Sequence, residues 1–185
     1  IVVNVHHFSQ LVKDYLASHS FEANIRISDE TDFLLDTGGG LKFAEQLLKN
    51  ADHILLHNVD IFSSIDLNRL IVNHIENRAL ATLAVKERST SRYLIFDKKS
   101  MQLCGWENVK TGERLESRSS RNPVKLAFSG IHVVSKEVFP MIPAAIAATV
   151  AAPKATGMRI LTIFFSLVSA FEFLRNSEGN ENFDE

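Results

Sequence analysis

Hydrophobic residues in the first half of the chain recur at two spacings, which predict strands alternating with helices. Short runs rich in β-branched and aliphatic residues predict strands at residues 1–5, 24–28, 53–57 and 79–85. Apolar residues at helical spacing predict helices at residues 8–16, 41–48 and 67–75. Strands and helices that alternate in this way predict parallel strands, right-handed crossovers and helices on both faces of the sheet.

Polar residues before two of these helices predict where the helices begin. Ser9 is the predicted N-cap of the first helix, and either Ser64 or Asp66 is the predicted N-cap of the third. The residues of the third helix that are expected to point inward share one apolar face; they are Leu67, Leu70, Ile71, His74 and Ile75.

The pattern changes after residue 90. Residues 93–96 and 101–104 are separated by a polar turn and predict a β-hairpin. Residues 107–124 are polar and predict a loop or an edge strand, and residues 126–134 predict a further strand. A short helix is expected from Ser135 to Phe139, ending at Pro140. The fold class expected is therefore α/β: a mixed, mainly parallel sheet of Rossmann-like type, flanked by helices and carrying a β-hairpin insertion.

The last forty residues have a different composition. Residues 144–155 are mostly alanine, and residues 160–171 form an uncharged apolar run. This run is shorter than the roughly 18 residues that cross a bilayer, so a buried helix is expected and no membrane partner. The acidic end, residues 176–185, is expected to fray.

Composition narrows the class of protein. A chain of 185 residues can bury the core of one domain, and a net charge of −2 gives no basic field for nucleic acid. The single cysteine, Cys104, fits a reducing compartment, so a cytoplasmic location is expected. The first residues, Ile1 to Val5, read as the middle of a buried strand, so we expect that a first segment of the domain is missing.

Three consecutive glycines, Gly38, Gly39 and Gly40, follow Thr37 and open the predicted second helix. Glycine adopts backbone angles closed to other residues and lets a ligand approach the main chain. The first turn of a helix offers free N–H groups and a partial positive charge, which suit phosphate. The segment therefore predicts contact with a phosphorylated ligand, the alternative being a purely structural turn.

Asp60 follows the third predicted strand, where ligands bind in sheets of this kind. A carboxylate there suits Mg²⁺, which takes one or two carboxylates together with phosphate oxygens and water. The alternative is an aspartate that only caps the next turn. Asp66 is better explained as an N-cap, and Asp36 as a brace for the glycine segment. The seven histidines lack the spacing of a zinc site, and Cys104 is expected to pack in its strand.

Taken together, these segments resemble the sugar-1-phosphate nucleotidyltransferases, and among them the mannose-1-phosphate guanylyltransferase-like and N-acetylmuramate-1-phosphate uridylyltransferase-like enzymes. The resemblance covers residues 1–142. The motifs that carry it are Val2–His7, Ile27–Glu30, Leu34–Gly40, Asn58–Asp60 and Phe128–Val133. It implies the nucleotide-diphospho-sugar transferase type of fold and transfer of NMP from an NTP, UTP or GTP, to a sugar 1-phosphate, with Mg²⁺ as cofactor (EC 2.7.7 type).

The resemblance also implies roles for individual residues. Asp60 would be the catalytic residue that holds Mg²⁺. Ser129, Gly130 and, with a weaker match, Glu107 would border the sugar. The residues that would line the nucleotide site are Thr37, Gly38, Gly39, Gly40 and Asn58.

Two parts of the family pattern are absent. The glycine- and arginine-rich phosphate loop would precede Ile1, and no second metal-binding aspartate is found, because Glu172 and Asp184 lack its context. Residues 144–185 do not resemble the family. We therefore expect the full-length protein to be the enzyme and this segment alone to be inactive.

The sequence leaves two other classes of protein open. One is a non-catalytic nucleotidyltransferase-like domain that binds nucleotide or a protein partner. The other is a flavodoxin-like or receiver-like domain, which the hairpin and the strand of residues 126–134 disfavour. The sequence also leaves open whether the protein forms a homo-oligomer.

Overall fold

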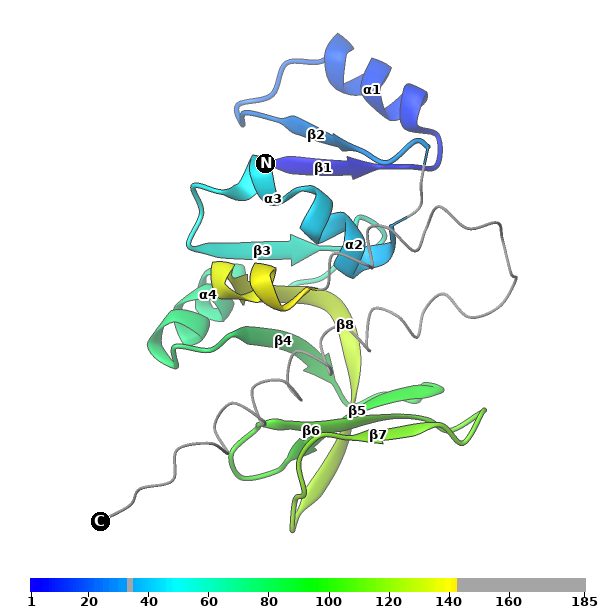
Figure 1. Ribbon diagram of the computed structural model, residues 1–185, viewed down its shortest axis with the longest axis vertical. Coiled ribbons are helices and arrows are strands. Elements are labelled where there is room, and N and C mark those ends of the chain that lie inside the picture. Colours follow the sequence, from blue (N-terminus) through cyan, green and yellow to red (C-terminus); the bar gives the residue numbers. More distant parts are fainter. Residues whose placement is uncertain (33–34, 143–185) are drawn as a thin grey trace. The chain divides into compact units, whose positions relative to one another are not determined.

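The computed structural model describes residues 1–32 and 35–142 (Figure 1). These residues form two compact units. The first unit contains residues 1–52 and 139–142, and the second contains residues 53–138. The elements predicted in residues 144–155, 160–171 and 176–185 lie outside the described residues. Within the described part, no helix has the length and apolar character needed to cross a membrane.

The first unit is built on two parallel strands, β1 (Val2–Val5) and β2 (Arg26–Asp29), joined by helix α1 (Ser9–Ser18). Their register sets Val2 opposite Arg26 and Val5 opposite Asp29. The parallel pairing predicted from the strand–helix–strand pattern is confirmed. The expected burial of β1 is wrong for most of it, because Val5 is buried whereas Val2 and Val3 are only half-buried.

Helix α1 begins differently from the prediction. Its N-cap is Phe8, in a left-handed conformation with φ of 54°, and no side chain caps the helix. Ser9 is instead the first helical residue and is buried. Val12 is half-buried, whereas Leu11 is exposed. The predicted apolar face of this helix is therefore only partly covered within the described residues.

The first unit also contains two short helices, α2 (Asp36–Phe43) and α3 (Glu45–Leu48). The prediction placed one helix at residues 41–48, so α2 begins five residues earlier than expected. The ammonium group of Lys42 donates to the carbonyl oxygen of Phe139 at 3.1 Å and forms an ion pair with Glu45 at 2.8 Å. These contacts hold the end of α2 within its unit.

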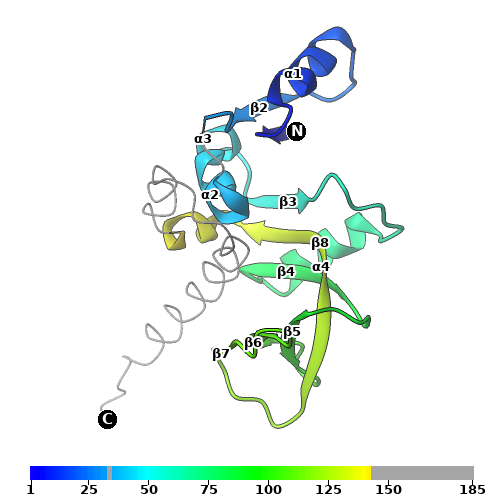
Figure 2. The same cartoon turned by 90° about the vertical axis from the view of Figure 1, so that its right-hand side faces the viewer.

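The second unit contains one six-stranded sheet, whose strands pair in the order β3-β8-β5-β6-β7 with β4 also pairing with β8. The strands are β3 (His53–His57), β4 (Ala81–Lys86), β5 (Arg92–Asp97), β6 (Leu103–Asn108), β7 (Arg114–Glu116) and β8 (Pro123–Ser135). The end of β8 lies between β3 and β4 and is antiparallel to both, and its beginning pairs with β5. Figure 2 shows β8 leaving the layer of β3 and β4 to reach β5.

This pairing corrects one part of the prediction, because the sheet was expected to be mainly parallel and most of the described strand pairs are antiparallel. β3 and β4 run in the same direction, as the alternating pattern indicated, because both are antiparallel to β8. They are not neighbours, however, since β8 separates them. The mixed α/β class with helices flanking the sheet is confirmed. Among the described pairs, hydrogen bonding is parallel between β1 and β2 and antiparallel within the six-stranded sheet.

Helix α4 (Leu67–Glu76) follows β3 and begins as predicted. Asp66 is its N-cap, and the Asp66 carboxylate accepts a hydrogen bond from the backbone N–H of Arg69 at 3.0 Å. His74 is fully buried on its inner face, where its ring nitrogens lie 2.9 Å from the Thr82 hydroxyl and 3.0 Å from the Ser135 hydroxyl. Ile75 was predicted to point inward but is exposed, because it lies at the edge of the apolar stripe.

The predicted hairpin is confirmed as β5 and β6, and β7 adds the edge strand expected among residues 107–124. Cys104 is buried in β6, as expected for a packing residue, and burial raises the pKa of its thiol. The last described element is a 3₁₀ helix (Lys136–Met141) that contains Pro140 instead of ending before it. Proline lacks a backbone N–H, but a short 3₁₀ helix contains so few hydrogen bonds that proline is tolerated there.

Candidate functional site

The three glycines lie inside helix α2 rather than in a turn before it. None of them has a positive φ, since the described glycines with positive φ are Gly112 and Gly130. The backbone freedom of glycine is therefore not what this segment requires. Glycine also lacks a side chain, and this property matters at Gly40.

Gly40 shows why the absence of a side chain matters. A Cβ atom at Gly40 would lie 2.7 Å from the Glu30 Oε1 atom and 3.2 Å from the Asn4 Nδ2 atom. Real Cβ atoms essentially never come within 3.0 Å of another group, so any larger residue would displace Glu30. At Gly40 the space beside the backbone is therefore taken by a protein carboxylate, and the predicted approach of a phosphorylated ligand stays a prediction.

Glu30 is a buried carboxylate at the carboxyl ends of the two parallel strands, with an exposed fraction of 4%. Its Oε1 atom accepts a hydrogen bond from the side-chain amide of Asn4 in β1. Its Oε2 atom accepts one from the backbone N–H of Leu35, the N-cap residue of α2, at 3.2 Å. Glu30 thus connects β1, the end of β2 and the start of α2.

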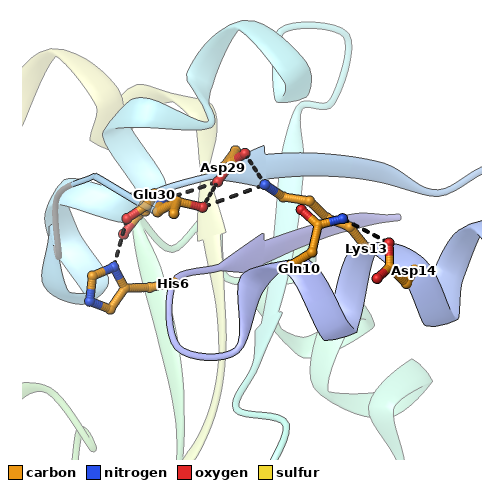
Figure 3. Close-up of polar contacts among 7 residues, drawn as sticks. His6, Gln10, Lys13, Asp14, Asp29 and Glu30 are labelled. Carbon is orange, nitrogen blue, oxygen red and sulfur yellow. Dashed lines mark hydrogen bonds and ion pairs between the residues drawn. The ribbon is translucent and has the colours of Figure 1, made fainter.

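The backbone of Glu30 also positions an imidazole. The Nδ1 atom of His6 lies 2.6 Å from the carbonyl oxygen of Glu30 (Figure 3). A carbonyl only accepts, so the Nδ1 atom of His6 donates this hydrogen bond. In the same view, Lys13 pairs with the neighbouring Asp29 on the exposed side. This ion pair is the main reason that the pKa of Asp29 falls to about 2.

The first turn of α2 is accessible next to this cluster. Thr37 is exposed and Gly38 is half-buried, whereas Gly39 and Gly40 are buried. The first backbone N–H groups of a helix have no acceptor within the helix, and Glu30 supplies one to the N–H of Leu35. An accessible first helical turn suits an anionic oxygen, so contact of Thr37 and Gly38 with phosphate stays a prediction from the sequence.

The remaining predicted residues lie in the second unit, where the structure brings Asn58, Asp60 and Gly130 together. The backbone N–H of Asn58 donates to the carbonyl oxygen of Gly130 at 3.0 Å, and the N–H of Ile61 donates to the carbonyl of Asn58 at 3.1 Å. The second bond closes a four-residue turn directly after β3. Asp60 lies in this turn with its side chain exposed.

Gly130 has the conformation that favours glycine, with φ of 76°. A Cβ atom there would lie 2.7 Å from the Ile61 Cγ1 atom and 3.2 Å from the Asn58 Nδ2 atom. The turn that carries Asp60 thus lies directly against the backbone of Gly130. Ser129 precedes it in β8 and is half-buried.

Glu107 does not join this group. It lies in β6 with an exposed fraction of 8%, and its Oε1 atom forms an ion pair with Lys125 at 2.5 Å. Lys125 precedes Ser129 by four residues in β8, which is about 13 Å along a strand. The Glu107 carboxylate is therefore neutralised at a distance from Ser129 and Gly130.

The single carboxylate of Asp60 fits a magnesium ion whose other ligands are phosphate oxygens and water. The structure shows no ion pair to Asp60 from any residue that it describes, so its two oxygens are accessible. Within the same residues, no three histidine, cysteine, aspartate or glutamate side chains are grouped to hold a metal. A single carboxylate suits Mg²⁺ when phosphate oxygens and water supply the other ligands.

Asn4 and Glu30 are functional candidates that the sequence did not single out as a pair. They occur in the resembling motifs, but they are 26 residues apart and nothing local connects them. A signal does exist, since Asn4 is a polar residue inside an otherwise apolar strand. Strands of parallel sheets usually read as near-continuous apolar runs, so a polar residue there marks a specific contact.

Comparisons with known proteins give similarity in structure without similarity in sequence. No family model and no curated protein matches the chain. Among solved structures, HddC from Yersinia pseudotuberculosis matches 77% of this chain with a TM-score of 0.58 and 15% identity, and the match covers 59% of HddC. An apo UDP-glucose pyrophosphorylase matches 94% of this chain with a TM-score of 0.56 and 13% identity, over 69% of that protein.

These likenesses show the fold. The chain has a mixed α/β architecture consistent with the nucleotide-diphospho-sugar transferase fold of these neighbours, as the sequence predicted. The chain spans about three fifths of the length of HddC.

Proposed function

We propose that the full-length protein is a nucleotidyltransferase that transfers NMP from an NTP to a sugar 1-phosphate, yielding an NDP-sugar and pyrophosphate. The observation that carries the proposal is the accessible first turn of α2, at the carboxyl ends of two parallel strands, with Glu30 fixing its start. The fold shared with a UDP-glucose pyrophosphorylase supports the same class of reaction.

The chemistry required is positioning and charge neutralisation. An oxygen of the sugar 1-phosphate attacks the α-phosphorus of the NTP, and the bond from that phosphorus to the pyrophosphate oxygen breaks. No side-chain nucleophile is needed in such an in-line displacement. Backbone amides of Thr37 and Gly38 would bind phosphate oxygens, and Gly39 and Gly40 would let the nucleotide lie against the helix. Asn58 would complete the nucleotide contacts.

Asp60 would hold Mg²⁺. The bound ion would neutralise the phosphate oxygens and orient them for displacement. The exposed turn after β3 leaves both carboxylate oxygens of Asp60 accessible for this role.

Ser129 and Gly130 would border the sugar, since they lie beside the turn that carries Asp60. Glu107 would act on the sugar only through a rearrangement of its ion pair with Lys125. UTP and GTP are the nucleotides to test, and a cytoplasmic location is part of the proposal.

The test is calorimetric binding of UTP and GTP to the full-length protein, with Mg²⁺ and with EDTA. Asp60→Asn keeps the shape of the side chain and removes its charge, so Mg²⁺-dependent affinity should fall about tenfold or more. Asp66→Asn is the matched control. Asparagine and aspartate are equally good N-cap residues, so the nucleotide affinity of this variant should not change.

The outcomes separate the classes of protein. Binding that requires Mg²⁺ and is lost in Asp60→Asn, followed by pyrophosphate release when a sugar 1-phosphate is added, supports the enzyme. Absence of binding to either nucleotide overturns it and favours a non-catalytic domain that binds a protein partner.

A further inference from the structure

We propose that Glu30 is a positioning residue for nucleotide binding, which holds the start of helix α2 so that its first-turn amides face the phosphates. The proposal rests on the proposed function and adds to it a residue that does not touch the substrate. Each contact that carries it lies within the first unit.

Burial of the carboxylate is the first reason. Glu30 and Ser28 are 4% and 2% exposed, and Ser28 is the register partner of Asn4 in β1. Parallel strands normally bury apolar residues at such positions. A buried carboxylate is costly unless it is fully hydrogen-bonded, so its presence indicates a specific task for its oxygens.

The division of its hydrogen bonds is the second reason. One carboxylate oxygen accepts from Asn4, and the other accepts from the N–H of Leu35 at 3.2 Å. The N–H of Leu35 belongs to the N-cap of α2, so the bond anchors the helix immediately before Asp36 and Thr37. A negative charge at a helix N-terminus also stabilises the helix.

The contact with Gly40 is the third reason. The Glu30 Oε1 atom occupies the space that a Cβ atom of Gly40 would need, at 2.7 Å. The helix is therefore fixed at two points about one and a half turns apart, at Leu35 by a hydrogen bond and at Gly40 by close contact. Between these points lie Thr37 and Gly38, the residues accessible to a ligand.

The test compares Glu30→Leu with Glu30→Gln in the full-length protein. Leucine removes both acceptors, so we expect the KM for the nucleoside triphosphate to rise tenfold or more, with the KM for the sugar 1-phosphate unchanged. Glutamine keeps one carbonyl oxygen for the Leu35 amide and should limit the rise to about threefold. A merely structural loss would lower kcat through the active fraction and leave both KM values unchanged.

Asp29→Leu is the matched control. It removes a carboxylate one residue earlier whose partners, Lys13 and Thr31, lie on the exposed side, so the nucleotide KM should not change. If Glu30→Leu does not fold, Glu30→Gln carries the test, and a nucleotide KM equal to that of the natural protein overturns the proposal.

The possible failures are distinguishable. A natural protein that binds neither UTP nor GTP overturns the proposed function together with this role. A natural protein that binds a nucleotide, with a Glu30→Leu variant that binds it equally well, overturns only the role of Glu30.

Discussion

Acidification should destabilise this protein through His132, a histidine in the middle of β8. Its exposed fraction is 4%, and its register partners are Leu56 in β3 and Leu83 in β4. Its Nδ1 atom has no hydrogen-bond partner among the residues that the structure describes. Burial lowers the pKa of His132 from 6.5 to about 4, because a charged imidazole would lose its hydration there.

The size of the effect follows from this shift. At about 1.4 kcal/mol for each pKa unit, the difference between 6.5 and about 4 corresponds to about 3 kcal/mol of the free energy of unfolding. A lowered pKa means that the unfolded chain binds the proton first. This stability is therefore complete above pH 6.5 and is lost progressively as the pH falls toward 4.

The assay is urea unfolding at pH values from 8 to 4, followed by the fluorescence of Trp106, the sole tryptophan, which is 1% exposed. His132→Gln removes the titration and should show a flatter profile. His57→Gln controls for the removal of an exposed histidine. Asp29 and Asp97, whose pKa values are lowered to about 2, lose their stabilising effect only below pH 4.

A direct comparison of the profiles decides the matter. If the free energies of unfolding of the natural protein and His132→Gln stay parallel from pH 7.5 to pH 4, burial does not suppress the charge of His132 and the reasoning is refuted. An imidazole pKa near 6.5 measured by NMR in the folded protein would refute it independently.

Two further predictions concern stability at neutral pH and are read from the midpoint of urea unfolding. Gly130→Ala should destabilise the protein by about 2–4 kcal/mol, because it adds contact with Ile61 to the strain of a left-handed residue. Gly112→Ala is the control, since Gly112 has the same φ but open space, and a loss as large as that of Gly130→Ala would contradict the steric argument. Asp66→Ala should cost about 1 kcal/mol by removing the cap of α4, whereas Ser64→Ala should change little; equal losses would show that the cap is not responsible.

Elements whose causes lie within a few residues could be predicted from the sequence. The strand His53–His57 was predicted with its observed bounds, because an unbroken apolar run predicts a strand without reference to its neighbours. Asp66 was proposed as a cap for a similar reason, since a cap contacts an amide three residues later. The prediction that Ser9 caps α1 was wrong. The chain enters α1 through Phe8 in a left-handed conformation, and no side-chain cap forms.

The candidate site was predicted only in part. Asn58, Asp60 and Gly130 were named from separate segments, and the structure brings them together because β8 lies beside β3. Glu107 was named as well, but its ion pair with Lys125 depends on three adjacent strands and has no local signal. Glu30 was not singled out, because its partners come from another strand and from the following helix.

The amino-acid sequence by itself determined the order and the type of most elements and the presence of three glycines before an apolar helical face. Only the tertiary structure decided that β8 separates β3 from β4 and that Gly40 must be small because Glu30 occupies its side. Periodicity and capping act over a few residues and are visible in a single segment. Strand neighbours and close contacts depend on segments far apart in the chain, and their packing selects one arrangement among those that the local pattern allows.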